Sequence, residues 1–211
     1  MTGKTHLLGG LLFTTSASLV MVAITNGEIN SYLAMIPFVL GGEFGAYLPD
    51  IDHPSSHISR QHPIISSFFR NDRRKKWKAA HDETLTEEER IAAEIAYEDA
   101  SHRGRTHYLF PWAIVLAIGL IALLVGKLIN NTIVIGAAIF LIGVFIGALS
   151  HLLLDMISGQ VPILGPFIRT GVGVRIFKTG GNLERILFRL VLLALNFVVW
   201  YALIMKLLIR R

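Results

Sequence analysis

Two aspartates and a histidine lie in one short turn that two prolines enclose. They are Asp50, Asp52 and His53, between Pro49 and Pro54. Each proline disfavours helical backbone in the residue before it, so the preceding apolar run should end here in an irregular turn. Carboxylates with an imidazole suit zinc, manganese or iron, and carboxylates alone suit magnesium. The turn is therefore a candidate metal site, with a polar helix cap at a membrane surface as the alternative.

A second candidate pair, His151 and Asp155, lies inside a later apolar run. Side chains four residues apart share one face of a helix, so both could bind one ion, or Asp155 could orient His151. The alternative is a hydrogen bond at a helix end. Ionisable residues within a membrane span favour a functional site.

A third candidate pair, His102 and His107, has Arg103 and Arg105 between its members. In a regular helix, residues five apart diverge by about 140°, so joint ligation requires a break at Gly104. The two arginines suit a phosphate oxygen. Ordinary positive charge beside a membrane is the alternative, and it is strong for Arg105 taken alone.

Long apolar runs must position these residues. The chain has 211 residues, 53% of them hydrophobic and 17% charged, which is more apolar and less charged than a soluble domain. We expect an all-α, multi-pass membrane helix bundle of about five spans. The expected spans are 7–25, 31–48, 108–129, 132–157 and 186–209. The chain has no cysteine, which excludes disulfides, thiolate metal sites and cysteine nucleophiles.

Small residues in two of these spans each indicate a close contact with another helix. Gly41, Gly42 and Gly45 lie in the second expected span, and Gly143 and Gly147 lie in the fourth. Glycines spaced in this way allow two helix backbones to come into contact.

One long polar segment, 54–107, separates the second and third spans. It contains the basic run 73–78, and Thr86 to Glu89 forms a capping box that predicts a helix through about Ala100. We expect a helical cytoplasmic insertion at the membrane interface within a single domain, 1–211. The basic run favours contact with anionic lipid headgroups over nucleic acid.

The expected topology gathers the polar residues on one side of the membrane. Five spans place the N-terminus, 54–107 and 158–186 together, with fifteen of the twenty lysines and arginines. The positive-inside rule assigns this side to the cytoplasm. All eight histidines fall on the same side. A bundle would bring them into one polar pocket with the aspartates, which is how bundle proteins build metal sites.

Taken together, these motifs resemble the YdjM-like family of predicted inner-membrane metal-dependent hydrolases. The motifs that carry the resemblance are Lys4-Thr5-His6, the run 48–56, the HRG-x-TH pattern at 102–107, His151 with Asp155, and 178–181 with Glu184. The family usually has a serine where this chain has Tyr108, and often one where it has Gly181. In ligand type and order, the set is also similar to the zinc-dependent phospholipase C and single-strand nuclease group.

We therefore expect a membrane-embedded metal-dependent hydrolase of the inner membrane, with its site and N-terminus in the cytoplasm. One to three ions would be bound, with zinc favoured and manganese or magnesium as alternatives. The expected ligands are His6, Asp50, Asp52, His53, His102, His107, His151 and Asp155. The metal would activate a water molecule, with Asp52 or Glu184 as the general base. Arg103 and Arg105 would hold a phosphate, and a lipid phosphoester is favoured because the site lies at the headgroup level.

Two other functions compete with this one. A non-enzymatic membrane metal-binding or transport protein would carry polar residues through the depth of the bundle, where only Glu43 and Asn196 lie. A lipid-binding or nucleic-acid-binding scaffold would use the basic run 73–78.

Overall fold

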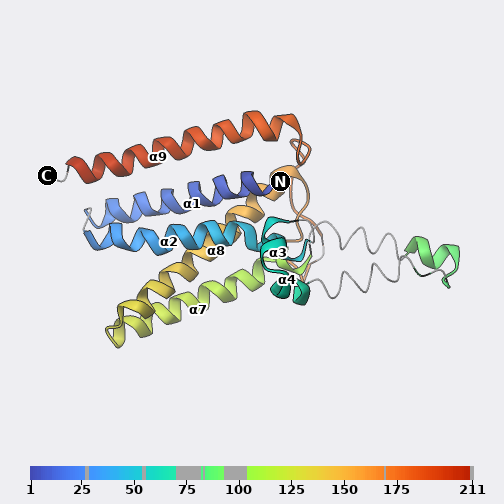
Figure 1. Ribbon diagram of the computed structural model, residues 1–211, viewed down its shortest axis with the longest axis horizontal. Coiled ribbons are helices and arrows are strands. Elements are labelled where there is room, and N and C mark those ends of the chain that lie inside the picture. Colours follow the sequence, from blue (N-terminus) through green and yellow to red (C-terminus); the bar gives the residue numbers. More distant parts are fainter. Residues whose placement is uncertain are drawn as a thin grey trace.

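The computed structural model describes residues 1–26, 29–53, 56–69, 82, 84–92, 104–168 and 170–209. In these ranges the secondary structure is helical, apart from one isolated antiparallel bridge between Val161 and Val172. Long helices lie side by side, and the N-terminus and the short helices gather at one end of the bundle (Figure 1). The predicted all-α helix bundle is confirmed.

Five long helices form the bundle. They are α1 (Gly3–Ile24), α2 (Ile29–Tyr47), α7 (Leu109–Leu128), α8 (Thr132–Ser158) and α9 (Arg189–Ile209). The shorter elements are the 3₁₀ turn η1 (Leu48–Asp52), α3 (His57–Gln61), α4 (Pro63–Phe69), the 3₁₀ turn η2 (Arg105–His107) and the π-helical turn η3 (Leu183–Phe188).

Among the described residues, four helices are long and apolar enough to cross a membrane. They are Gly3–Ile24, Leu109–Leu128, Thr132–Ser158 and Leu183–Ile209, the last of which joins η3 to α9. The remaining long helix, α2, was the fifth expected span; it has 19 residues, includes Pro37 and Glu43, and lies alongside α1 in Figure 1. Four spans and this packed helix agree with the predicted bundle of about five.

The backbones of α2 and α8 are in direct contact because both helices carry glycine there. A Cβ atom on Gly45 would lie 2.1 Å from the carbonyl oxygen of Val144, and one on Gly147 would lie 2.0 Å from that of Gly42. No side chain tolerates such distances, so the contact requires glycine. Each glycine set predicted a close helix contact in its own span, and the structure pairs the two spans with each other.

The α1 and α7 helices pack directly against this pair, and α9 packs against α1. A cluster of Trp112, Val144, Ala148, Leu152 and Val161 packs α7 against α8 and the segment that follows α8. The last helix, α9, lies at the edge of the bundle next to α1 (Figure 1). The N-terminal part of α1 therefore lies between α9 and the α2–α8 pair.

Part of the polar insertion is described. The Thr86 hydroxyl and backbone N–H both donate to Glu89 Oε2, at 2.8 and 3.0 Å, so the predicted capping box is confirmed. Its helix is described through residue 92, and the predicted continuation to Ala100 lies outside the described residues. The basic run 73–78 also lies outside them.

Candidate metal centre

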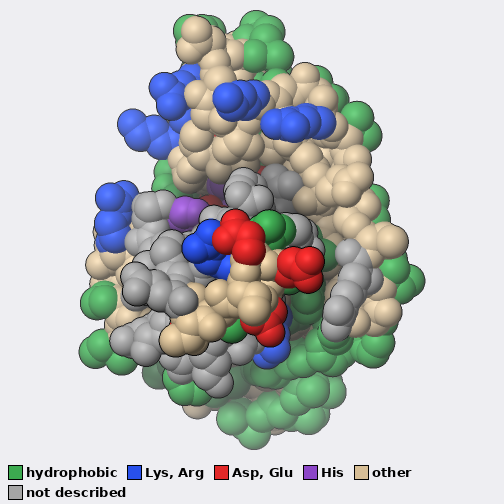
Figure 2. Space-filling view, turned by 90° about the vertical axis from the view of Figure 1, so that its right-hand side faces the viewer, with side chains coloured by type: hydrophobic (Ala, Val, Ile, Leu, Met, Phe, Trp, Pro, Cys, Tyr) green, Lys and Arg blue, Asp and Glu red, His purple; other side chains and the backbone are tan. Residues whose placement is uncertain are grey.

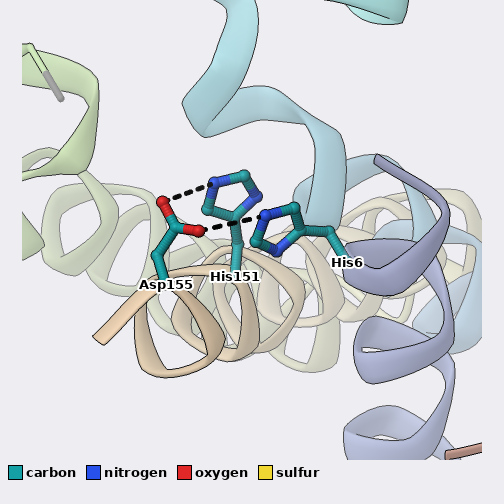
Figure 3. Close-up of side chains that lie close together, drawn as sticks. All are labelled: His6, His151 and Asp155. Atoms are coloured by element: carbon teal, nitrogen blue, oxygen red, sulfur yellow. Dashed lines mark ion pairs between the residues drawn. The ribbon is translucent and has the colours of Figure 1, made fainter. Parts of the chain in front are cut away.

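Five ionisable side chains meet at the end of the bundle where the chain begins. We call them the metal centre: His6 from α1, Asp50 from η1, His107 from η2, and His151 and Asp155 from α8. Figure 3 shows His6 facing His151 and Asp155 across the contact between α1 and α8. Four of the five are buried, and the Asp50 side chain is 28% exposed. Residues about 150 positions apart in the sequence therefore share one site.

Four donor atoms lie close together in the centre. The Nε2 atom of His107 lies 3.8 Å from Asp50 Oδ1 and 3.6 Å from Asp155 Oδ2. The Nε2 atom of His151 lies 3.6 and 3.9 Å from the same two oxygens. Donors around a tetrahedral zinc ion, at bonds of about 2.0–2.1 Å, are about 3.4 Å apart. These nitrogen–oxygen distances are close to that spacing, and Asp50, His107 and His151 form one group whose ligand atoms could hold an ion.

The second oxygen of Asp155 faces a different part of the centre. Its Oδ1 atom lies 3.2 Å from His6 Nε2, and His6, His151 and Asp155 form another group whose ligand atoms could hold an ion. The amino group of Met1 makes an ion pair with this same oxygen. A cationic group therefore lies at Asp155 Oδ1, as a metal ion would, and His151 is the residue that the two groups share.

The buried ring of His6 fits a metal ligand better than a structural residue. It stacks on His151, with ring centroids 3.6 Å apart and planes at 12°. Neither of its nitrogens makes a hydrogen bond within the described structure, and Nε2 approaches Asp155 without the direction of one. Because burying a polar group without a partner costs free energy, a divalent ion would supply what this nitrogen lacks. The residues of the centre fit such an ion.

A backbone contact orients His151. Its Nδ1 atom lies 2.8 Å from the carbonyl oxygen of Ala46 in α2. Since a carbonyl can only accept, Nδ1 carries the hydrogen and Nε2 presents a lone pair to the centre. Backbone carbonyls commonly fix metal-binding histidines in this way.

A tryptophan fixes the turn that carries His107. The Nε1 atom of Trp112 donates to the Thr106 carbonyl at 2.8 Å, which ties η2 to the first turns of α7. Before this turn, a Cβ atom on Gly104 would lie 2.5 Å from Asp52 Oδ2. At Gly104, where joint ligation by His102 and His107 would require a break in the helix, the backbone passes close beside the Asp52 side chain.

The other expected ligands lie outside the two groups of ligand atoms. Asp52 and His53 follow Asp50 in and after η1, and both are partly exposed. His102 and Arg103 lie outside the described residues, and Arg105 is exposed in η2. Of the eight expected ligands, the described structure brings together five: His6, Asp50, His107, His151 and Asp155.

Glu184 has partners other than the metal ligands. It is fully buried and accepts hydrogen bonds from Thr2, Thr5 and Gly180. The carboxylate that we expected as a candidate base is therefore already hydrogen-bonded to the N-terminal turn. Neither threonine stood out in the sequence as a functional residue, although Thr5 lies in the Lys4-Thr5-His6 motif.

Burial raises the pKa of Asp50 above the ordinary range for an aspartate, and the nearby Asp155 carboxylate adds to this rise. The neighbouring histidines oppose part of the effect. A bound cation would reverse it, because the positive charge favours the ionised carboxylate.

The face of the molecule at this end of the bundle is partly basic. Figure 2 shows lysine and arginine side chains on the upper part of this face, and Asp and Glu side chains nearer its middle. Exposed basic residues at this end of the bundle include Arg105, Arg175, Lys178 and Arg185.

Comparison with known proteins identifies a family. The family described as YdjM inner membrane protein matches residues 1–209. A Bacillus subtilis (strain 168) protein, described as uncharacterized protein YvsG, is 37% identical over 68 residues, which are 31% of this chain and 35% of that protein. The chain therefore matches about a third of the length of this relative. No solved structure matches it.

Proposed function

Because the chain belongs to the YdjM inner membrane protein family, and because its described residues gather metal-binding side chains, we propose that it is a membrane-embedded metal-dependent hydrolase. The observation that carries the proposal is the presence of two groups of ligand atoms, Asp50 with His107 and His151, and His6 with His151 and Asp155. Imidazoles together with carboxylates suit zinc, and manganese or magnesium are the alternatives.

A bound metal would lower the pKa of a water molecule and polarise the bond to be cleaved. The chain itself supplies the other parts of the reaction. Asp50 is the most exposed of the five residues, so we place the substrate entrance on its side. Asp52 follows in the same turn, outside the two groups of ligand atoms, and we assign it the proton of the attacking water.

The surroundings favour a phosphoester, most of all a lipid headgroup, as the substrate. Its negative charge would be attracted by the exposed basic residues at this end, which are Arg105, Arg175, Lys178 and Arg185. We assign Arg103 the same role. The site lies at the end of the spans, where headgroups of a bilayer would lie. By the positive-inside rule, this end faces the cytoplasm.

Metal content of detergent-purified protein tests the proposal first. We expect near-stoichiometric metal in the native protein and loss of metal in both Asp50→Ala and His151→Ala. His62→Ala is the matched control, because His62 is exposed and lies outside the groups of ligand atoms. Native protein without metal, after reconstitution with zinc and with manganese, would overturn the proposed site.

Activity is the second test. We expect the metal-loaded protein to hydrolyse lipid or nucleotide phosphoesters, and Asp52→Asn to lose turnover while it keeps the metal. Metal-bound protein that is inert on every ester of both classes would contradict hydrolysis and leave a metal-binding protein.

The arrangement of the deeper polar residues favours a hydrolase over a transporter. Transport requires polar groups that line a path between the helices. In α1, the buried hydroxyls of Thr14 and Ser18 instead donate to carbonyls of their own helix, at 2.8 Å each. Metal-ion flux through the protein in proteoliposomes would reverse this order of preference.

A further inference from the structure

A single buried carboxylate ties the start of the chain to the segment before α9. The Oε1 atom of Glu184 accepts hydrogen bonds from the Thr2 backbone N–H at 2.7 Å, the Thr2 hydroxyl at 2.8 Å and the Thr5 hydroxyl at 2.7 Å. Its Oε2 atom accepts from the Gly180 N–H at 2.7 Å. These hydrogen bonds are short, and the Glu184 side chain that accepts them has no exposed surface.

An arginine completes this network from the opposite side of the two hydroxyls. Arg189 Nη2 donates to the Thr2 hydroxyl at 2.6 Å, and Arg189 Nε donates to the Thr5 hydroxyl at 3.2 Å. A hydroxyl has one hydrogen to donate and two lone pairs with which to accept. Each threonine can therefore donate to Glu184 and accept from Arg189, which fixes both side chains.

The π-helical turn η3 explains why two residues five apart act together. In an α-helix, Glu184 and Arg189 would diverge by about 140° and could not both face α1. A π-helix bonds each residue to the fifth along, so residues five apart come to one side. The turn spans Leu183–Phe188 and therefore covers the interval between the two residues.

The network also supplies what the first turn of α1 lacks. The helix has no side-chain cap of its own, and the backbone N–H groups of Thr5 and His6 donate to the Thr2 carbonyl. Glu184 accepts the Thr2 N–H from outside the helix and places a negative charge near the helix N-terminus, where it is stabilising. His6 directly follows Thr5, so the turn that Glu184 fixes is the turn that carries a metal ligand.

We propose that Glu184 and Arg189 form a clamp that holds the first turn of α1 and thereby positions His6 in the metal centre. Glu184 is then a positioning residue. Its consequence for metal binding rests on the proposed function, whereas its effect on the N-terminal turn does not.

Metal affinity in a double-mutant cycle tests the positioning. We expect Glu184→Gln to weaken metal binding roughly tenfold to a hundredfold, as loss of an outer partner of a ligand does. In a His6→Ala background the same change should have little further effect, because the clamp acts through His6. Glu88→Gln, at an exposed glutamate, is the matched control and should change nothing. Equal losses in both backgrounds would overturn the proposal.

Hydrogen exchange in the metal-free protein tests the clamp separately. We expect amides of residues 3–10 to exchange faster in Glu184→Gln and in Arg189→Gln, with no change at the α2–α8 contact. Thr5→Val, which keeps the shape of the side chain, gives the same comparison should Glu184→Gln fail to fold. Unchanged exchange at the N-terminal turn would overturn the clamp, and native protein without metal would overturn only the proposed function.

Discussion

The ring of His151 donates a hydrogen bond from Nδ1 to the carbonyl oxygen of Ala46, across 2.8 Å. This bond links α8 to the last turn of α2, directly before the turn that carries Asp50. The geometry of the metal centre therefore depends on how closely the two helices pack, and the glycines between them set that distance.

Gly147→Ala should separate the two helices and weaken metal binding. Its Cβ atom would lie 2.0 Å from the carbonyl oxygen of Gly42, which belongs to backbone and cannot turn aside. Forced overpacking of this kind costs about 1–3 kcal/mol of stability. Thermal unfolding and metal content in detergent measure both effects. Gly136→Ala in the same helix is the control, because its Cβ would have no neighbour within 4 Å. Equal behaviour of the two variants would contradict the close contact.

Asp155 and His6 should differ in their effect on metal binding. Asp155 places Oδ1 beside His6 and Oδ2 beside His107 and His151, so Asp155→Ala should abolish binding. His6 lies on one side of Asp155 only, so His6→Ala should weaken binding and leave the other four residues able to hold an ion. Calorimetric titration of both variants with zinc measures their affinities and distinguishes the two results. Complete loss in His6→Ala would show that the four donors do not suffice.

As the pH is lowered, metal affinity should begin to fall at a pH above the ordinary range for an aspartate. The pKa of Asp50 is raised, chiefly by burial, so its carboxyl group becomes protonated sooner as the pH falls. A protonated carboxyl group is a poor ligand, and metal affinity should fall through this range. Affinity measured against pH tests the expectation, and a loss only at the pH where ordinary aspartates titrate would contradict it.

The metal-free protein should show the opposite dependence on pH. A carboxyl group whose pKa is raised by folding stabilises the folded state below the unfolded pKa, and this contribution is lost as the pH rises through the folded pKa. The stability of the native protein relative to Asp50→Asn should therefore fall as the pH rises across that window. Thermal unfolding of both proteins after chelation measures it, and a constant difference would contradict the raised pKa.

Gly104→Ala should impair turnover more than metal binding. The new Cβ would lie 2.5 Å from Asp52 Oδ2 and would push this side chain from its place. If Asp52 takes the proton from the attacking water, turnover should fall about 10²–10⁴-fold, as it should in Asp52→Asn. Metal content measured beside hydrolysis separates the two effects. Unchanged turnover in both variants would remove Asp52 from the reaction.

Several features of this protein follow from the sequence because they depend on residues that are near one another along the chain. Long apolar runs define membrane-spanning helices whatever they pack against. The spacing of His151 and Asp155 places both on one face of any α-helix, and the alternation of spans gathers the histidines at one end. Glycines spaced along two spans indicated close helix contacts, and the structure showed that α2 and α8 make them with each other.

The choice among the candidate ligands was decided only by the tertiary structure. Asp50 and Asp52 lie in one 3₁₀ turn, where residues two apart point in different directions, and contacts with distant segments determine which one faces the centre. The sequence indicated Glu184 as a candidate base equal to Asp52. A π-helical turn and two threonines about 180 residues away bind it to α1 instead. Spacing fixes neighbours along a helix, but the partners of a turn depend on how separate helices pack.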